Sequence, residues 1–142
     1  MNRLIGVWKL ERWKSEDREP FGADPLGTLV YTTHGTMISC FMRRQRVPVA
    51  ASMEELASWR RQPMSKDLER RFLDAALSFN SYSGRYVVEG THVHHDVEIA
   101  LFPDWIGKRL TRDFRLEGDR LALSFGRDVL SWLRRANADT VL

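Results

Sequence analysis

Short segments in which apolar and polar residues alternate, separated by turn residues, constrain this chain more than any other feature. In the first such segment, every second position is occupied by Leu4, Gly6, Trp8 and Leu10. Alternation of this kind is typical of a strand with one buried face. The same pattern recurs over residues 28–32, 36–42, 81–89, 91–102, 108–116, 120–125 and 129–134. The chain is therefore predicted to be mainly β, with about eight antiparallel strands in up-and-down order, closed into a barrel without free edges.

Residues 52–79 change to helical periodicity. Ser52 followed by Glu55 is a capping box, and Pro63 ends the apolar stripe behind it. A second helix is expected to begin at Ser65, because apolar residues then recur at helical spacing. We expect two short helices, inserted between the third and fourth strands, that cover one opening of the barrel.

Composition limits the classes of partner and compartment. The 142 residues, 43% of them hydrophobic, suffice for a single domain over 1–142 that needs no disulfide or metal to fold. Cys40 is the one cysteine, so an internal disulfide and a thiolate metal cluster are excluded. The net charge of +3, without basic residues clustered beside aromatic ones, predicts no nucleic-acid partner.

Hydropathy predicts no contact with a membrane. No apolar run approaches the roughly 20 residues that a membrane-spanning helix needs. The first residues lack the apolar core of a signal peptide. We expect a cytoplasmic protein that is a monomer or a homodimer.

Several short motifs follow one another along most of the chain. They are Gly6-Val7-Trp8, residues 27–32 before a turn at His34-Gly35, residues 82–86, His94-His95, residues 101–107, Arg112-Asp113-Phe114 and residues 116–121. In this order they resemble the bacterial and fungal lipocalin-like domain family, β-barrel proteins of the calycin type. The resemblance implies an internal pocket for a small organic molecule and, for some members, a place in secondary-metabolite biosynthesis, but no particular reaction. It also implies that Arg134 lies over Trp8 and closes one barrel end.

Strand alternation predicts which side chains face the interior. The apolar face of one strand comprises Val93, His95, Val97, Ile99 and Leu101. His92 and His94 lie on its polar face, so metal binding by these histidines is only a surface alternative and no metal is expected. The same test places Arg112, Tyr82 and Tyr86 inside.

An inward arginine needs a partner. Arg112 must meet a carboxylate, a set of carbonyls or an anionic ligand, because an unpaired buried guanidinium is costly. Glu11, Asp113 and Glu117 near strand ends are the candidate protein partners, and a ligand carboxylate or phenolate is the alternative. For His95, a hydrogen bond to a buried tyrosine and contact with a ligand are both open.

The leading hypothesis is a barrel that binds one small, largely apolar molecule that is aromatic or anionic. The residues expected to contact this ligand are Arg112, His95, Tyr82, Tyr86, Tyr31, Phe114, Val97 and Trp105. Trp105 belongs to a turn that either covers the barrel end or lines its mouth. No cofactor is expected.

Two other functions remain open. A cofactor-free isomerase, cyclase or dehydratase would use His95 as general acid or base and Arg112 to stabilise an enolate. The sequence contains no nucleophile elbow, phosphate loop or dinucleotide fingerprint, so it does not decide whether the protein is an enzyme. An interaction protein with a barrel filled by large side chains, among them Trp8, is the third hypothesis.

Overall fold

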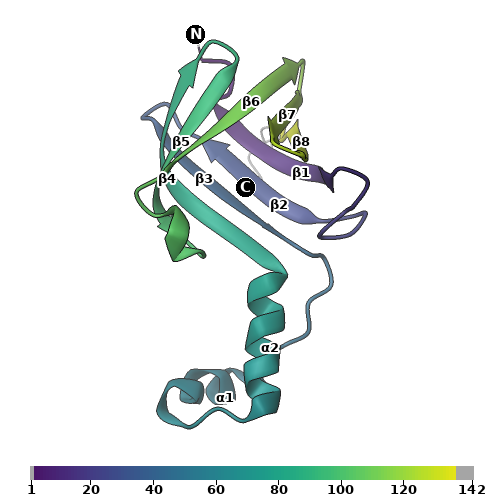
Figure 1. Cartoon of the computed structure of the whole chain (residues 1–142), viewed down its shortest axis with the longest axis vertical. Helices are drawn as coiled ribbons and strands as arrows, with labels where there is room; N and C mark the ends of the chain where they lie inside the picture. The colour runs from purple at the N-terminus through teal and green to yellow at the C-terminus, as the bar shows by residue number, and fades with distance from the viewer. Residues whose placement is uncertain (1, 137–142) are drawn as a thin grey trace, which may run out of the picture.

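The alternating segments form the eight strands of one closed antiparallel barrel (Figure 1). The structure is a computed structural model that describes residues 2–136. The strands are β1 (Gly6–Ser15), β2 (Leu26–Tyr31), β3 (Thr36–Met42), β4 (Phe79–Glu89), β5 (His92–Ala100), β6 (Arg109–Glu117), β7 (Arg120–Phe125) and β8 (Asp128–Arg134). Each pairs with its neighbours in sequence, and β8 also pairs with β1. The predicted eight-strand up-and-down barrel is confirmed.

Two helices connect β3 to β4, as predicted. They are α1 (Met53–Ser58), which runs on into the 3₁₀ turn η1 (Trp59–Arg61), and α2 (Lys66–Leu77). Ser52 Oγ accepts the backbone N–H of Glu55 at 3.1 Å, and Ser65 Oγ accepts that of Leu68 at 3.1 Å. Both helices therefore begin at the predicted caps. Among residues 2–136 no helix is both long and apolar enough to cross a membrane.

The helices do not cover the barrel. Figure 1 shows α1 and α2 projecting away from it as a helical arm, which we define as residues 53–77. The expected cover is wrong because α2 passes through a single residue, Ser78, into β4. The helix consequently continues outward from the end of that strand instead of folding back over the opening.

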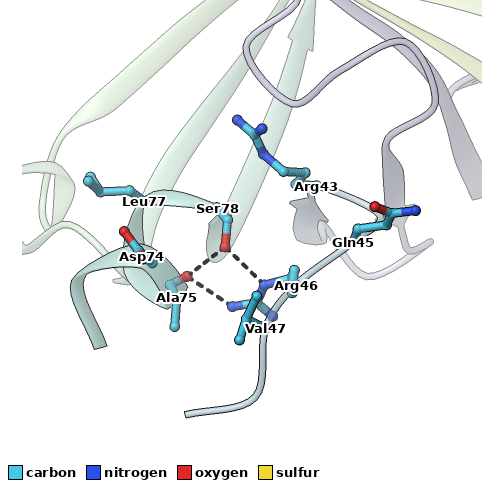
Figure 2. Close-up of a pocket in the computed structure, with 8 residues that line it drawn as sticks. All are labelled: Arg43, Gln45, Arg46, Val47, Asp74, Ala75, Leu77 and Ser78. Carbon is cyan, nitrogen blue, oxygen red and sulfur yellow. Dashed lines mark hydrogen bonds between the residues drawn. The ribbon is translucent and has the colours of Figure 1, made fainter. Parts of the chain in front are cut away.

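Arg46 fastens the base of the helical arm (Figure 2). Its Nη2 donates to the Ala75 carbonyl at 2.9 Å, and its Nε donates to Ser78 Oγ at 3.1 Å. The Ala75 carbonyl also accepts Ser78 Oγ at 3.3 Å, and a cation at this end of α2 is favoured by the helix dipole. The same contacts border an open depression of about 340 Å³ outside the barrel. This depression lies where the helical arm is connected to the barrel.

A β-bulge in β5 interrupts the predicted alternation. Val97 and Ile99 pair with consecutive residues of β4, which leaves Glu98 as the extra residue between them. Side chains beyond the bulge change face, so Ile99 is 70% exposed and Leu101 is 37% exposed. The prediction that these two residues point inward is therefore wrong.

Candidate functional site

The barrel encloses a cavity of about 230 Å³. It lies toward the end from which the helical arm leaves, since its wall includes Phe41 near the end of β3 and Asn80 near the start of β4. The wall is mainly apolar and consists of Trp13, Ser39, Phe41, Asn80, Tyr82, Phe102, Trp105, Arg112, Leu123, Phe125, Leu130 and Trp132. A cavity of about 150 Å³ accommodates benzene. This cavity therefore has room for an aromatic ring with a substituent.

A second bulge brings Trp13 into the wall. In the pairing of β1 with β8, Leu10 and Arg12 oppose adjacent residues, so Glu11 is extra. The bulge turns Trp13 inward, where its Nε1 donates to the Asp128 carboxylate at 2.9 Å. An uninterrupted strand would have turned the charged side chain of Arg12 inward instead.

The loop between β5 and β6 contributes two aromatic rings to the wall. A 3₁₀ turn, η2 (Pro103–Trp105), brings Trp105 edge-on to Tyr82, with 5.6 Å between ring centroids. Phe102 packs edge-on against Trp105 at 5.1 Å. Trp105 thus lines the cavity instead of only covering the barrel end.

Arg112 carries the positive charge of the wall. Its guanidinium carbon lies 3.7 Å from the centroid of the Phe125 ring, and its Nη1 donates a long 3.5 Å hydrogen bond to the Thr111 carbonyl. The expected acidic partners are engaged elsewhere, in the pairs Glu11–Arg120, Asp113–His92 and Glu117–Arg115. Among residues 2–136 no carboxylate forms an ion pair with Arg112.

Two wall residues hold buried polar atoms without a hydrogen-bond partner in the described chain. They are Asn80 Oδ1, an acceptor, and Trp132 Nε1, a donor. A buried polar atom left unpaired costs about 1–3 kcal/mol. Unpaired buried polar atoms are uncommon in native proteins, so these two mark this part of the wall as unusual.

His95 joins two tyrosines in a buried hydrogen-bonded triad. Its Nε2 lies 2.7 Å from Tyr31 Oη, and its Nδ1 lies 2.9 Å from Tyr82 Oη. Burial and, to a smaller degree, the nearby Arg112 lower the pKa of His95 to about 3. Burial raises the pKa of both tyrosines, while Arg112 opposes that rise. All three side chains are therefore uncharged at neutral pH.

Three of the predicted contact residues line the cavity, namely Tyr82, Trp105 and Arg112. The wall does not include His95, Tyr31, Tyr86, Val97 or Phe114. The Tyr31 ring packs against those of Tyr86 and His95, with centroids 4.7 and 5.7 Å apart. These rings fill the other part of the interior, and Tyr86 Oη donates outward to the Thr32 carbonyl at 2.6 Å. His95 reaches the cavity only through Tyr82.

Sequence reasoning missed most of the wall. Asn80 lies two residues before Tyr82 on the same strand and therefore on the same face. Extending the predicted strand by one residue would have placed Asn80 inside the barrel. Trp132 lies two residues before the inward Arg134, so the same alternation would have predicted that it faces inward, and it is buried. Alternation along the first strand does not predict an inward Trp13, because the bulge reverses the face on which this residue lies.

Arg134 lies over Trp8 at the filled end of the barrel. The guanidinium carbon is 4.2 Å from the ring centroid, and the two Nη atoms donate to the carbonyls of Ile5 at 2.7 Å and Arg3 at 2.8 Å. A Cβ at Gly6 would come within 2.8 Å of Arg134 Nη1, so glycine permits this close approach. The geometry is that of a cation–π plug.

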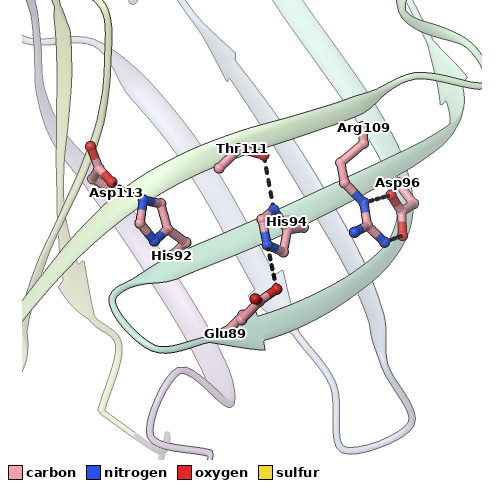
Figure 3. A network of polar contacts seen from close by, with 7 residues as sticks. All are labelled: Glu89, His92, His94, Asp96, Arg109, Thr111 and Asp113. Atoms are coloured by element: carbon pink, nitrogen blue, oxygen red, sulfur yellow. Dashed lines mark hydrogen bonds and ion pairs between the residues drawn. The ribbon is translucent and has the colours of Figure 1, made fainter.

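His92 and His94 lie on the outer surface of the barrel (Figure 3). His92 Nε2 is 2.7 Å from the Asp113 carboxylate, and His94 Nε2 is 3.2 Å from that of Glu89. Each imidazole thus has its own carboxylate. Within residues 2–136 there is no cluster of three side chains arranged to hold a metal ion.

Comparisons with known proteins agree with this architecture. The family model described as a lipocalin-like domain matches residues 5–142. A lipocalin-like protein from Bacteroides uniformis aligns with a TM-score of 0.52 and 11% identity, covering 94% of this chain and 100% of that one. An uncharacterized protein from Bacteroides eggerthii aligns with a TM-score of 0.50 and 9% identity, covering 93% and 99%. No curated protein matches significantly. At these identities the structural likeness concerns the fold alone.

Proposed function

Since the chain belongs to the lipocalin-like domain family, we propose that it binds one small aromatic anion in the cavity of its barrel. Arg112 is the observation that carries this proposal. Its guanidinium borders an apolar cavity, lies over the Phe125 ring and has no carboxylate partner in the described chain. A carboxylate or phenolate of a ligand would supply the missing charge through a bidentate or single charge-assisted hydrogen bond.

The shape of the cavity supports an aromatic ligand. Trp13, Phe41, Trp105 and Trp132 offer flat apolar surfaces around a volume of about 230 Å³. Flat rings pack against such walls at centroid distances of about 4.5–7 Å. Ser39 and Asn80 add uncharged polar side chains to this mainly apolar wall.

A barrel filled by side chains would not leave a cavity of this size, so the interaction-protein hypothesis has less support. The enzyme hypothesis loses its direct general base, because His95 is fully buried and stands behind Tyr82. We therefore propose binding and not a reaction.

Titration of the intrinsic tryptophan fluorescence tests the proposal, because three tryptophans line the cavity. We expect saturable quenching by 2-naphthoate and weaker quenching by 2-methylnaphthalene, which has the same ring system without the charge. Arg112→Met should weaken 2-naphthoate binding roughly tenfold to a hundredfold, the value of a hydrogen bond to a charged group. Its effect on 2-methylnaphthalene should be small.

Arg115→Met is the matched control. Arg115 lies on the same strand but on the exposed face, and it pairs with Glu117 at 3.3 Å. This variant should bind 2-naphthoate as the parent protein does. The proposal fails if the parent shows no saturable quenching, or if the two arginine variants bind 2-naphthoate equally well.

A further inference from the structure

The buried triad of Tyr31, His95 and Tyr82 contains one more hydroxyl proton than its own hydrogen bonds use. The neutral imidazole carries one N–H, and each tyrosine carries one O–H, which makes three protons. Two hydrogen bonds join the three side chains. One hydroxyl proton must therefore be directed away from the triad, toward a partner elsewhere.

Surroundings decide which tyrosine has the spare proton. Tyr31 is 1% exposed, and its hydroxyl has no acceptor other than His95 among residues 2–136. Tyr82 lines the cavity. Directing the Tyr31 proton away from His95 would leave it buried and unpaired, whereas the Tyr82 proton can reach a molecule in the cavity. Tyr31 consequently donates to His95 Nε2.

The tautomer of the imidazole follows from this assignment. With Nε2 accepting, the single proton of neutral His95 lies on Nδ1, which then donates to Tyr82 Oη. The low pKa of His95 keeps the ring neutral over the physiological range. Asn80 Oδ1, an acceptor in the cavity wall, has no hydrogen-bond partner in the described chain and so does not accept the Tyr82 proton.

We infer that His95 is fixed as the Nδ1–H tautomer, so that the Tyr82 hydroxyl donates into the cavity and, together with Arg112, selects a ligand oxyanion, either a carboxylate or a phenolate. This inference rests on the proposed binding function and names the group that the ligand must present. Tyr82 and Arg112 line the same cavity. The guanidinium also acts on the Tyr82 hydroxyl, where its charge and a side-chain hydrogen bond oppose the rise in the pKa of Tyr82 that burial causes. With the triad oriented in this way both groups act as donors, so a cationic ligand of the same shape is excluded.

Nuclear magnetic resonance tests the tautomer on the unmodified protein. A long-range ¹H–¹⁵N correlation spectrum distinguishes a protonated imidazole nitrogen from a bare one, and His95→Gln assigns the signal. We expect protonated Nδ1 and bare Nε2 at pH 7, with or without 2-naphthoate. A protonated Nε2 overturns the inference whether or not the ligand binds.

Binding tests the role of Tyr82. Tyr82→Phe should weaken 2-naphthoate roughly tenfold, as expected for a lost hydrogen bond to a charged group, and leave 2-methylnaphthalene unchanged. Tyr86→Phe is the matched control, because Tyr86 faces inward from the same strand but bonds the Thr32 carbonyl outside the cavity wall. 2-Naphthylmethylamine, the cation of similar shape, should not bind the parent protein.

The outcomes separate the inference from the proposed function. Saturable 2-naphthoate binding that Tyr82→Phe leaves unchanged, or equal binding of the amine, overturns the inference and retains the binding function. If the parent binds none of the three probes, both proposals fail. Native near-ultraviolet circular dichroism of Tyr82→Phe establishes that the cavity is intact, and the tautomer measurement does not depend on that variant.

Discussion

His95 is a wholly buried residue held neutral by its surroundings. It is 0% exposed, and hydrogen bonds to Tyr31 and Tyr82 replace those that its ring nitrogens would make to water. Protonation would introduce a charge into the barrel interior next to Arg112, which explains why the pKa falls to about 3. The unfolded chain has no such constraint, so its histidine titrates near pH 6.5.

This difference predicts a pH-dependent stability. The folded pKa lies below the unfolded value, so His95 contributes its full stability above pH 6.5, and the contribution falls as the pH drops toward 3. Each pH unit within this window costs about 1.4 kcal/mol, which gives a loss of about 2 kcal/mol between pH 7 and pH 5. Urea unfolding followed at several pH values measures the slope.

Two variants identify the source of that slope. His95→Gln should unfold with a smaller change in free energy between pH 7 and pH 5, although it is less stable throughout. His34→Asn should retain the slope, because His34 is exposed in a turn. Equal slopes in the parent and in His95→Gln would contradict the prediction.

At the scale of the strand, alternation predicts a face only while the pairing is regular. It placed Tyr82, His95 and Arg112 correctly inside because β4 and β6 contain no extra residue in their pairing with β5, and His95 precedes the bulge in β5. It failed for Ile99, which follows the bulge in β5, and it gave no indication that Trp13, which follows the bulge in β1, faces the cavity. A bulge depends on how two distant strands meet, so one segment read alone does not contain it.

Gly84 makes the β5 bulge possible and supplies a prediction at this scale. A Cβ at this position would overlap the Asp96 carbonyl oxygen of the neighbouring strand, which is backbone and cannot move aside. Gly84→Ala should therefore lower the free energy of unfolding by about 3 kcal/mol, at the upper end of the cost of overpacking. Chemical denaturation with tryptophan fluorescence measures the change.

Ser83→Ala is the control for Gly84→Ala. Ser83 is the adjacent residue of β4 and pairs with Ile99 at the same bulge, but its side chain points outward. Its variant should unfold at nearly the same denaturant concentration as the parent. A Gly84→Ala protein of parental stability would show that the strands separate at the bulge without cost.

For the whole molecule, the barrel interior divides into a filled part and a hollow part. Trp8, Tyr31, Tyr86 and His95 pack the first, and the cavity occupies the second. The sequence predicted the strand number, the order and the position of the helical insertion, because these depend on local periodicity and caps. It did not predict which part is hollow, because that depends on how large side chains from several strands share one volume.

The direction in which the helical arm projects could not be predicted from the sequence either. The helices were expected to cover one opening of the barrel, yet the Trp59 and Phe72 rings pack against each other within the arm, with centroids 4.9 Å apart. The caps at Ser52 and Ser65 specify where the helices begin. They carry no information on what the helices then contact.

The arm and the barrel should consequently respond separately to substitution. Phe72→Ala removes half of the Trp59–Phe72 pair and should speed proteolytic cleavage of the arm, measured as the rate at which parent chain disappears. The barrel should keep its unfolding free energy and its affinity for 2-naphthoate, because Phe72 does not line the cavity. Phe41→Ala, within the wall, should instead cost about 3–5 kcal/mol and weaken binding. Loss of 2-naphthoate affinity in Phe72→Ala would mean that the arm closes over the cavity in solution, contrary to the extended arrangement in Figure 1.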